Sequence, residues 1–446
     1  MSVKLISTLY SFFEKKIILF LIIFLFFTGN SFSNTNKKIN YVLGCNNKAS
    51  QDYLKKIDNL KIKKIEVDTI NYKKWTVNSI RIITSRFRYV STKYKKRYDA
   101  IIFVTYEDNT KCIFEGRIRH SGDEKDHISL SENAIIQSID VHLNNGNIRG
   151  ITKFKLLRPK TRGNLEDEIL LTELLRNLNY LAPRTFKVSA RINQANSEMI
   201  FQEKASKELL EFNGRREGPI LEGDERFFFK TIENIPDNQL SGWSVGVVPL
   251  MNKSVKHMLT KQVNSRIIHK SLGHKNMSFN SSTNLNLIYL YYSNKFQDKK
   301  NNYNYFDYDL DNTLLSFFDP KNILKLDAYN LLIQATNSGH GLAPNNRKFF
   351  WNSLENYFEP INYDSNPDID SGIQTTKVPR LPISNQFFKA FDFLENNIRD
   401  LDLTKLQKNI NLSGISISKD TLNLRIEKIL KNLAQIKKNY INISDK

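Results

Sequence analysis

The sequence predicts an α+β fold with two lobes, because short strands come first, one helix follows, and the remainder is mainly helical. Between residues 98 and 157, β-branched and aromatic runs alternate with turn sequences and show no helical period. Residues 164–178 then carry apolar side chains at helical spacing. We therefore expect an antiparallel sheet in the first lobe and chiefly helices in the second.

The strands of the first lobe alternate in polarity and are separated by turns rich in Asn, Asp and Gly. We expect them at residues 100–106, 112–120, 138–143, 148–157, 186–192 and 199–203. Asn164 is expected to cap the intervening helix, whose first turn holds Glu166, Asp167 and Glu168. Carboxylates at these positions suit the positive end of the helix dipole.

The second lobe is expected to begin with a short helix at about residues 205–211 and to contain a loop-rich stretch around 230–310. Residues 348–351 and 357–363 are expected to form a hairpin closed by a polar turn. An amphipathic helix at about 420–440 should end the chain.

The amino terminus predicts export. Lys15 and Lys16 precede an apolar run at residues 17–27, and eleven helical residues rise about 16 Å, short of the roughly 30 Å hydrocarbon core. Ser31–Ser33 fits a cleavage site, so residues 1–33 are predicted to be a signal peptide, with a signal anchor as the alternative. In either case we expect the protein in the periplasm or cell envelope, touching the membrane only through this segment.

The remaining chain is predicted to divide into a lysine-rich leading segment, residues 34–98, and a main domain, residues 99–446, with lobes at about 99–204 and 205–446. The net charge is +20, but the lysines are spread along the whole chain, which argues against a nucleic-acid partner. The densest basic run, Lys93–Arg97, is interpreted as a solvated face. Cys45 and Cys112 could form one disulfide in an oxidising compartment.

The predicted hairpin is a candidate metal and phosphate site. A hairpin returns the chain to its start, so Asn345 or Asn346 before it could face Asp364 after it. Amide and carboxylate oxygens are the ligands that Mg²⁺ takes when phosphates and water complete its shell. The alternative is a surface hairpin in which these residues serve only the turns.

Two lysines and three histidines are further candidates. Lys153 and Lys155 lie two apart on a predicted strand and share one face, so a carboxylate of the following helix could hold either against a phosphate. The alternative is a pair of exposed lysines on an edge strand. His120, His127 and His142 lie near Asp123 and Asp126 and could bind a metal or act as a base, although their spacing fits no standard ligand pattern.

Ordered fragments of the chain resemble the CotH family of spore-coat-type atypical protein kinases. The resemblance covers about residues 100–375 and is carried by Arg117–Gly122, Lys153–Leu156, the helix at 164–178, Tyr180–Arg184, Val188–Asn193, Ile200–Glu203, Asn346 and Tyr363–Asp364. It implies a divergent protein-kinase-like fold that uses ATP or another nucleotide together with Mg²⁺ or Mn²⁺.

The resemblance also implies roles for single residues. Lys153 or Lys155 would contact the nucleotide phosphates, Glu168 or alternatively Glu173 would hold that lysine, Glu203 would lie where the lobes meet, and Asn346 and Asp364 would bind the metal. Catalytic loops of kinases place an Asp five residues before the metal-binding Asn, and here that position is Gly341. Its neighbour His340 could serve as the base instead.

We therefore expect an exported CotH-like enzyme that transfers a phosphoryl group from a nucleotide to a hydroxyl of a protein or an envelope glycan. The alternative is a catalytically inactive protein of similar fold that binds an envelope polysaccharide or a protein partner. Gly341 favours the alternative, whereas the lysine, glutamate, Asn346 and Asp364 set favours the enzyme.

Overall fold

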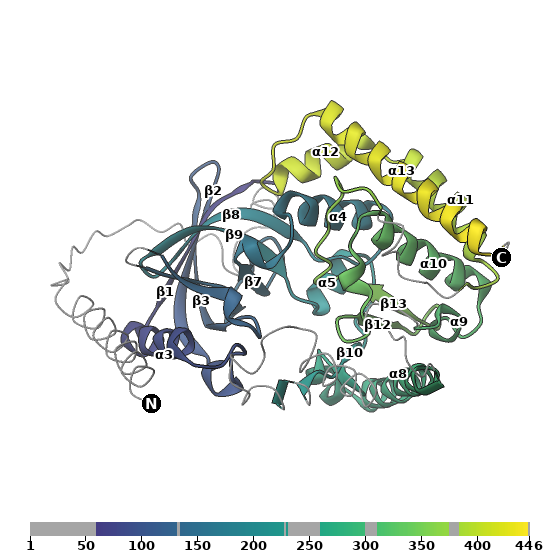
Figure 1. Ribbon diagram of the computed structural model, residues 1–446. Helices are drawn as coiled ribbons and strands as arrows, with labels where there is room; N and C mark the ends of the chain where they lie inside the picture. Colours follow the sequence, from purple (N-terminus) through teal and green to yellow (C-terminus); the bar gives the residue numbers. More distant parts are fainter. Residues whose placement is uncertain are drawn as a thin grey trace, which may run out of the picture. The chain divides into compact units, whose positions relative to one another are not determined.

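The computed structural model describes residues 59–131, 134–226, 229–230, 259–298, 310–373 and 383–444 (Figure 1). The predicted signal segment, Cys45 and much of the loop-rich stretch at 230–310 lie outside these ranges. Within the described ranges, the helices are either too short or too polar to cross a membrane. Cys112 is buried and disulfide-bonded.

The first half of the described chain is a closed β-barrel (Figure 1). Its strands, in spatial order, are β1 (Ile62–Thr69), β2 (Tyr98–Tyr106), β3 (Lys111–His120), β6 (Ile139–Leu143), β7 (Lys153–Leu157), β9 (Ala195–Glu203) and β8 (Thr185–Ile192). Neighbouring strands are antiparallel except β1 and β8, which pair in parallel and close the barrel. Alternate apolar residues such as Ile65, Ile102 and Phe154 are fully buried in one core.

The predicted fold class is wrong. In place of an antiparallel sheet beside a helical lobe, as in kinases, the described strands close into a seven-strand barrel of mixed direction. The physical reason is β1, which lies in the segment expected to lead the domain. It alternates buried and exposed residues, pairs with β2 from Ile62 to Thr69, and also pairs with β8, where Lys64 lies opposite Ser189. A strand with two partners leaves the sheet no edge there.

Short elements surround the barrel. Helix α3 (Tyr72–Thr84) packs Trp75 edge-on against Tyr98, with ring centres 5.3 Å apart. A ribbon of β4 (Ile128–Ser131) and β5 (Ala134–Gln137) lies between β3 and β6 in sequence. Single turns of 3-10 helix occur at η2 (Thr92–Tyr94), η3 (Lys125–His127) and η4 (Pro159–Thr161).

The second half is mainly helical but also contains a second, four-stranded sheet, of which the sequence predicted only the last hairpin. The sheet has the order β11 (Thr260–Gln262), β10 (Ile220–Gly223), β12 (Lys348–Asn352) and β13 (Tyr357–Ile361). One apolar core joins α4 (Leu165–Asn177), α10 (Pro320–Ala335), α11 (Phe387–Arg399), α12 (Leu403–Leu412) and α13 (Lys419–Ser444). The other elements are α5 (Lys207–Phe212), η7 (Ser265–His269), α8 (Leu272–Asp298), α9 (Asn312–Leu315) and η8 (Gly339–Leu342).

Candidate anion-binding site

A cavity of about 550 Å³ is lined both by residues of the barrel and by residues of the β10–β13 sheet, a volume that suits a small-molecule ligand. Most of its charged side chains are basic. They are Arg119, Lys155, Lys204, Arg226, Lys230, Lys261 and Lys348, against the acidic Asp123, Asp140, Glu222 and Glu225. Ala205 and Val263 add apolar wall. The lining therefore favours an anion with some apolar surface.

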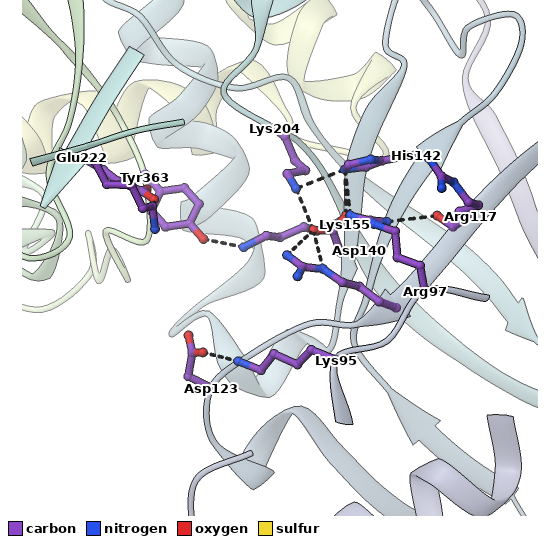
Figure 2. A network of polar contacts seen from close by, with 12 residues as sticks. Lys95, Arg97, Arg117, Asp123, Asp140, His142, Lys155, Lys204, Glu222 and Tyr363 are labelled. Carbon is purple, nitrogen blue, oxygen red and sulfur yellow. Dashed lines mark hydrogen bonds and ion pairs between the residues drawn. The ribbon is translucent and has the colours of Figure 1, made fainter. Parts of the chain in front are cut away.

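The aromatic ring of Tyr363 lies among the lysines that line the cavity. It follows β13, and its phenol oxygen lies 2.5 Å from Nζ of Lys155, which comes from β7 of the barrel (Figure 2). The Nζ of Lys348, at the start of β12, lies 4.1 Å from the centre of the same ring. An ammonium over an aromatic face is stabilised by the ring's electron density. Tyr363 thus holds two cations from different elements against one cavity.

Asp140 neutralises a second group of cations at the barrel wall. Figure 2 shows Lys204, Arg97 and His142 gathered around its carboxylate. Oδ2 accepts from Nζ of Lys204 at 2.6 Å and from Arg119 at 3.1 Å, while Oδ1 accepts from Arg97 at 3.1 Å and lies 3.2 Å from Nε2 of His142. Burial would raise the pKa of Asp140, but its bonds to His142 and Lys204 outweigh it and hold that pKa far below the usual value.

The lysines of the cavity repel one another. Burial, followed by the charges of Lys155 and Lys204, lowers the pKa of Lys348 to about 7. Burial together with the charge of Lys155 also lowers the pKa of Lys204 to about 8, although Asp140 opposes this change. Lys348 also pairs with Glu222. A bound anion would relieve this repulsion and favour the protonated lysines, so these shifted pKa values support an anion site.

A neutral hydrogen-bonding pair lines another part of the cavity. The Nδ2 of Asn345 donates to Oε1 of Glu225 at 2.7 Å. Burial raises the pKa of Glu225 to about 8, and the bond from Asn345 opposes that shift only in part. At neutral pH this carboxyl therefore carries a proton that it can donate to a ligand.

The predicted metal ligands do not fit a divalent cation as they stand. Oδ1 of Asp364 lies 2.7 Å from Nη1 of Arg162, whose side chain is only 4% exposed, so a guanidinium already neutralises this carboxylate. The amide nitrogen of Asn346 lies 2.9 Å from Nε2 of His340 and donates to it. In the described part of the chain, the His, Cys, Asp and Glu side chains form no group of three or more that could hold a metal.

The predicted catalytic position has no room for a carboxylate. A Cβ at Gly341 would lie 2.5 Å from Oγ and 3.2 Å from Cα of Ser365, closer than packed atoms tolerate. The Nε2 lone pair of His340 accepts the Asn346 amide, so it is not free to take a proton from an acceptor hydroxyl in this arrangement. Neither residue has the geometry of a catalytic base.

Replacing Gly341 with Ala should lower the free energy of unfolding by about 1–3 kcal/mol, because the new methyl group overpacks against Ser365. The matched control is Gly273→Ala on α8, where the nearest heavy atom to a new Cβ is 3.7 Å away. The control should be neutral, or gain up to about 1 kcal/mol from helix propensity. Urea unfolding of both variants measures the difference, and equal stability of the two would contradict the close contact.

The expected pairing of a strand lysine with a helix glutamate is not formed, although the residues concerned are all described. Lys155, not Lys153, lines the cavity, and it bonds Tyr363. The Oε1 of Glu168 instead accepts from Gln202 at 2.9 Å. Burial would raise the pKa of Glu208, but its hydrogen bonds from Ser206, its own backbone and Thr152, and then the charge of Lys153, lower it.

The other two predicted glutamates form ion pairs with arginines. Glu203 forms a two-pronged pair with Arg184, at 2.9 and 2.5 Å, and both side chains are buried. Glu173 pairs with Arg176, accepts from Ser413 at 2.9 Å, and lines a different cavity of about 650 Å³. Neither lines the cavity around Tyr363.

The three histidines are not brought to one place. Nε2 of His142 lies 3.2 Å from Asp140, whereas His127 contacts Ser138 at 3.0 Å and lies close enough to His120 for the charge of His120 to lower its pKa further, after burial and the charge of Arg162. Burial lowers the pKa of His120 to about 4 and that of His127 to about 3, so both stay neutral near pH 7. Their predicted metal role is not supported by the described residues.

Sequence reasoning missed Asp140, Lys204, Lys348 and Arg162. The signal available for Asp140 was a carboxylate between the apolar residues Ile139 and Val141 of a predicted strand, since a buried charge needs partners. The interpretation of the basic run Lys93–Arg97 as a solvated face holds for Lys93 and Lys96, which are exposed, but not for the other two basic residues. Side chains of its Lys95 and Arg97 are only 15% and 24% exposed, and they pair with Asp123 and Asp140.

Comparison with known proteins adds no relative: no family model matches the chain, and no curated protein matches it at a significant level. The resemblance to the CotH family therefore stays a prediction.

Proposed function

We propose that this is an exported binding protein that holds a phosphate-bearing ligand in the cavity around Tyr363 without transferring the phosphoryl group. The observation that carries the proposal is the convergence of Lys155, Lys204 and Lys348 on one cavity. Phosphate and diphosphate groups are compact anions that several lysines can neutralise together. A nucleotide and a phosphorylated envelope glycan share this chemistry, so both belong to the proposed ligand class.

The lysines would act as point charges that become fully protonated when the anion enters. Lys348 and Lys204, with pKa values of about 7 and 8, carry a partial charge in the free protein near neutral pH. The negative ligand raises both values, so binding takes up protons. Tyr363 and Glu225 can add hydrogen bonds from their hydroxyl groups.

Export of the protein is part of the proposal. It is supported by the apolar run at residues 17–27 and by the disulfide bond of Cys112, because disulfides persist in oxidising compartments. A phosphorylated glycan of the envelope would be available there, whereas a nucleotide would have to be supplied.

Metal-dependent phosphoryl transfer to a protein or glycan hydroxyl is the second candidate. It is favoured by the ionised form of Asp364, which a metal ligand requires: burial would raise the pKa of Asp364, but the charges of Arg162, His340 and Lys155 lower it. Asn346, which bonds His340, lines the same cavity. The ion pair of Asp364 with Arg162 and the packing at Gly341 both speak against it.

Titration of the full-length protein with pyrophosphate, ATP and a sugar phosphate, in EDTA and in Mg²⁺, tests the proposal through the melting temperature. A ligand at 100 times its dissociation constant should stabilise the protein by roughly 2.7 kcal/mol. Lys348→Met should weaken binding at least about tenfold, or about 1.4 kcal/mol, because it removes a cation from the cavity.

The matched control is Lys325→Met, which removes a lysine that also pairs with a glutamate, Glu355, but lies on α10 outside the cavity lining. It should bind like the wild type. Equal affinities of the two variants, or no binding of any phosphate compound by the wild type, would overturn the proposal. Binding that requires Mg²⁺ and yields a phosphorylated acceptor would favour the second candidate.

A further inference from the structure

Arg162 is a buried cation that forms an ion pair with Asp364. It follows η4, in the loop before α4, and its Nη1 donates to Oδ1 of Asp364 at 2.7 Å and to the carbonyl oxygen of Thr161 at 2.9 Å. Its Nε is buried and has no hydrogen-bond partner among the described residues. Burial would lower the pKa of Arg162, but Asp364, Tyr363 and then Glu168 outweigh it.

A second carboxylate, which is fully buried, is acted on by the same charge. Glu168 on α4 is fully buried, and its Oε2 has no hydrogen-bond partner among the described residues. Burial raises the pKa of Glu168, the charge of Arg162 lowers it, and the charge of Asp364 raises it again. The charge of Arg162 therefore acts on two carboxylates from different elements, Asp364 after β13 and Glu168 on α4.

The backbone at Asp364 is held in an uncommon conformation. Its φ of 51° lies in the left-handed region, as does the φ of 50° at Asn366. Single non-glycine residues persist there when surrounding contacts over-determine them, and such positions gather at ligand sites. The Asp364 side chain is 24% exposed, so small ions from the solvent can reach it.

We propose that Arg162 takes the place of a divalent cation at Asp364 and Glu168, so that removing its guanidinium creates a site for Mg²⁺ or Mn²⁺. Without a cation, a fully buried carboxylate and a partly buried one whose charges act on each other are costly, so they must either take up protons or recruit a positive ion. Hard carboxylate oxygens suit Mg²⁺ and Mn²⁺. In the native protein the guanidinium supplies this charge permanently.

This role would also make ligand binding independent of metal. The centre of the Arg162 guanidinium lies 6.0 Å from the Tyr363 ring, so its charge adds to those of Lys155 and Lys348 around that ring. A diffusible metal would normally supply positive charge next to a bound phosphate. Here Arg162 is a positioning residue that holds Asp364, and its guanidinium supplies this positive charge permanently.

The test measures binding of Mn²⁺ alone to the full-length protein, by the loss of the free-ion electron paramagnetic resonance signal, in wild type, Arg162→Ala, Arg162→Lys and the double variant Arg162→Ala with Asp364→Asn. Arg162→Ala should bind one more Mn²⁺ per chain than the wild type, at least tenfold tighter than any site of the wild type. Arg162→Lys, which keeps a cation, and the double variant, which loses a ligand, should not gain this site.

The proposal fails if Arg162→Ala binds no more Mn²⁺ than the wild type, or if the wild type already binds Mn²⁺ in a way that Asp364→Asn abolishes. Should the alanine variant not fold, Arg162→Gln, which keeps most of the side-chain volume, is judged by the same outcomes. The assay contains no phosphate compound. Its failure would therefore leave the proposed anion binding untouched, and failure of anion binding would leave this site standing.

Discussion

Replacing Asp140 with Asn should lower the free energy of unfolding by about 3–5 kcal/mol, the cost of removing one partner from a buried ion pair. The side chain of Asp140 is only 2% exposed, and its two oxygens meet Arg97, Arg119 and Lys204. Asparagine keeps the shape but not the charge, so three cations would be left without their shared anion. Urea unfolding at pH 7 measures the loss.

Glu198→Gln is the matched control. It also removes one carboxylate from an ion pair, with Lys187, but this carboxylate is 62% exposed, so its loss should change stability by no more than about 0.5 kcal/mol. Pyrophosphate should restore more stability to Asp140→Asn than to the wild type, because a bound anion can neutralise the cations that Asp140 leaves. A loss below about 1 kcal/mol for Asp140→Asn would contradict its central role in the network.

Local patterns in the sequence predicted several elements well. The helix expected at residues 164–178 is α4, Leu165–Asn177, and Asn164 caps it by accepting from the backbone N–H of Glu166 at 3.0 Å. The hairpin expected around residues 348–363 is formed by β12 and β13. These elements depend on hydrophobic periodicity and helix capping, which are determined by residues close together in the sequence.

The closed barrel could not be predicted in the same way, because its closure is a long-range pairing. Strand β1 joins β8, and Val67 lies opposite Ile192. Alternation in each strand shows that one face is buried, but it does not name the partner strand or its direction. Without that pairing, the strands of the first half are equally compatible with an open antiparallel sheet, and the resemblance to kinases favoured the open form.

The candidate site was predictable only in part, because local sequence patterns do not identify long-range partners. Of the two candidate lysines, Lys155 lines the cavity, and so does Tyr363 at the end of the predicted hairpin. Arg162 lies in a loop, where the sequence has no hydrophobic periodicity. Its neighbours in the sequence therefore did not indicate that it would pair with Asp364. The identity of a carboxylate's counter-charge is set by the tertiary fold, not by the strand or helix that carries it.

Lowering the pH from 7.5 to 4 should cost the wild type about 3 kcal/mol more stability than it costs His120→Gln. Burial, followed by the charge of Lys95, lowers the pKa of His120 from 6.5 to about 4 in the folded protein. The unfolded chain therefore binds more protons than the folded chain once the pH falls below 6.5. This histidine's contribution to stability is lost progressively down to about pH 4, whereas glutamine has no proton to gain.

The measurement is the free energy of urea unfolding at half-unit steps across this range. The difference between wild type and variant is the relevant quantity, because other groups titrate equally in both. Ile118→Val, on the same strand and fully buried, is the control. It should cost about 0.5–1.5 kcal/mol at every pH, since it removes a methyl group and no ionisable group. If the His120→Gln difference is equally constant, burial does not hold the ring of His120 neutral, and the expected lowering of its pKa is wrong.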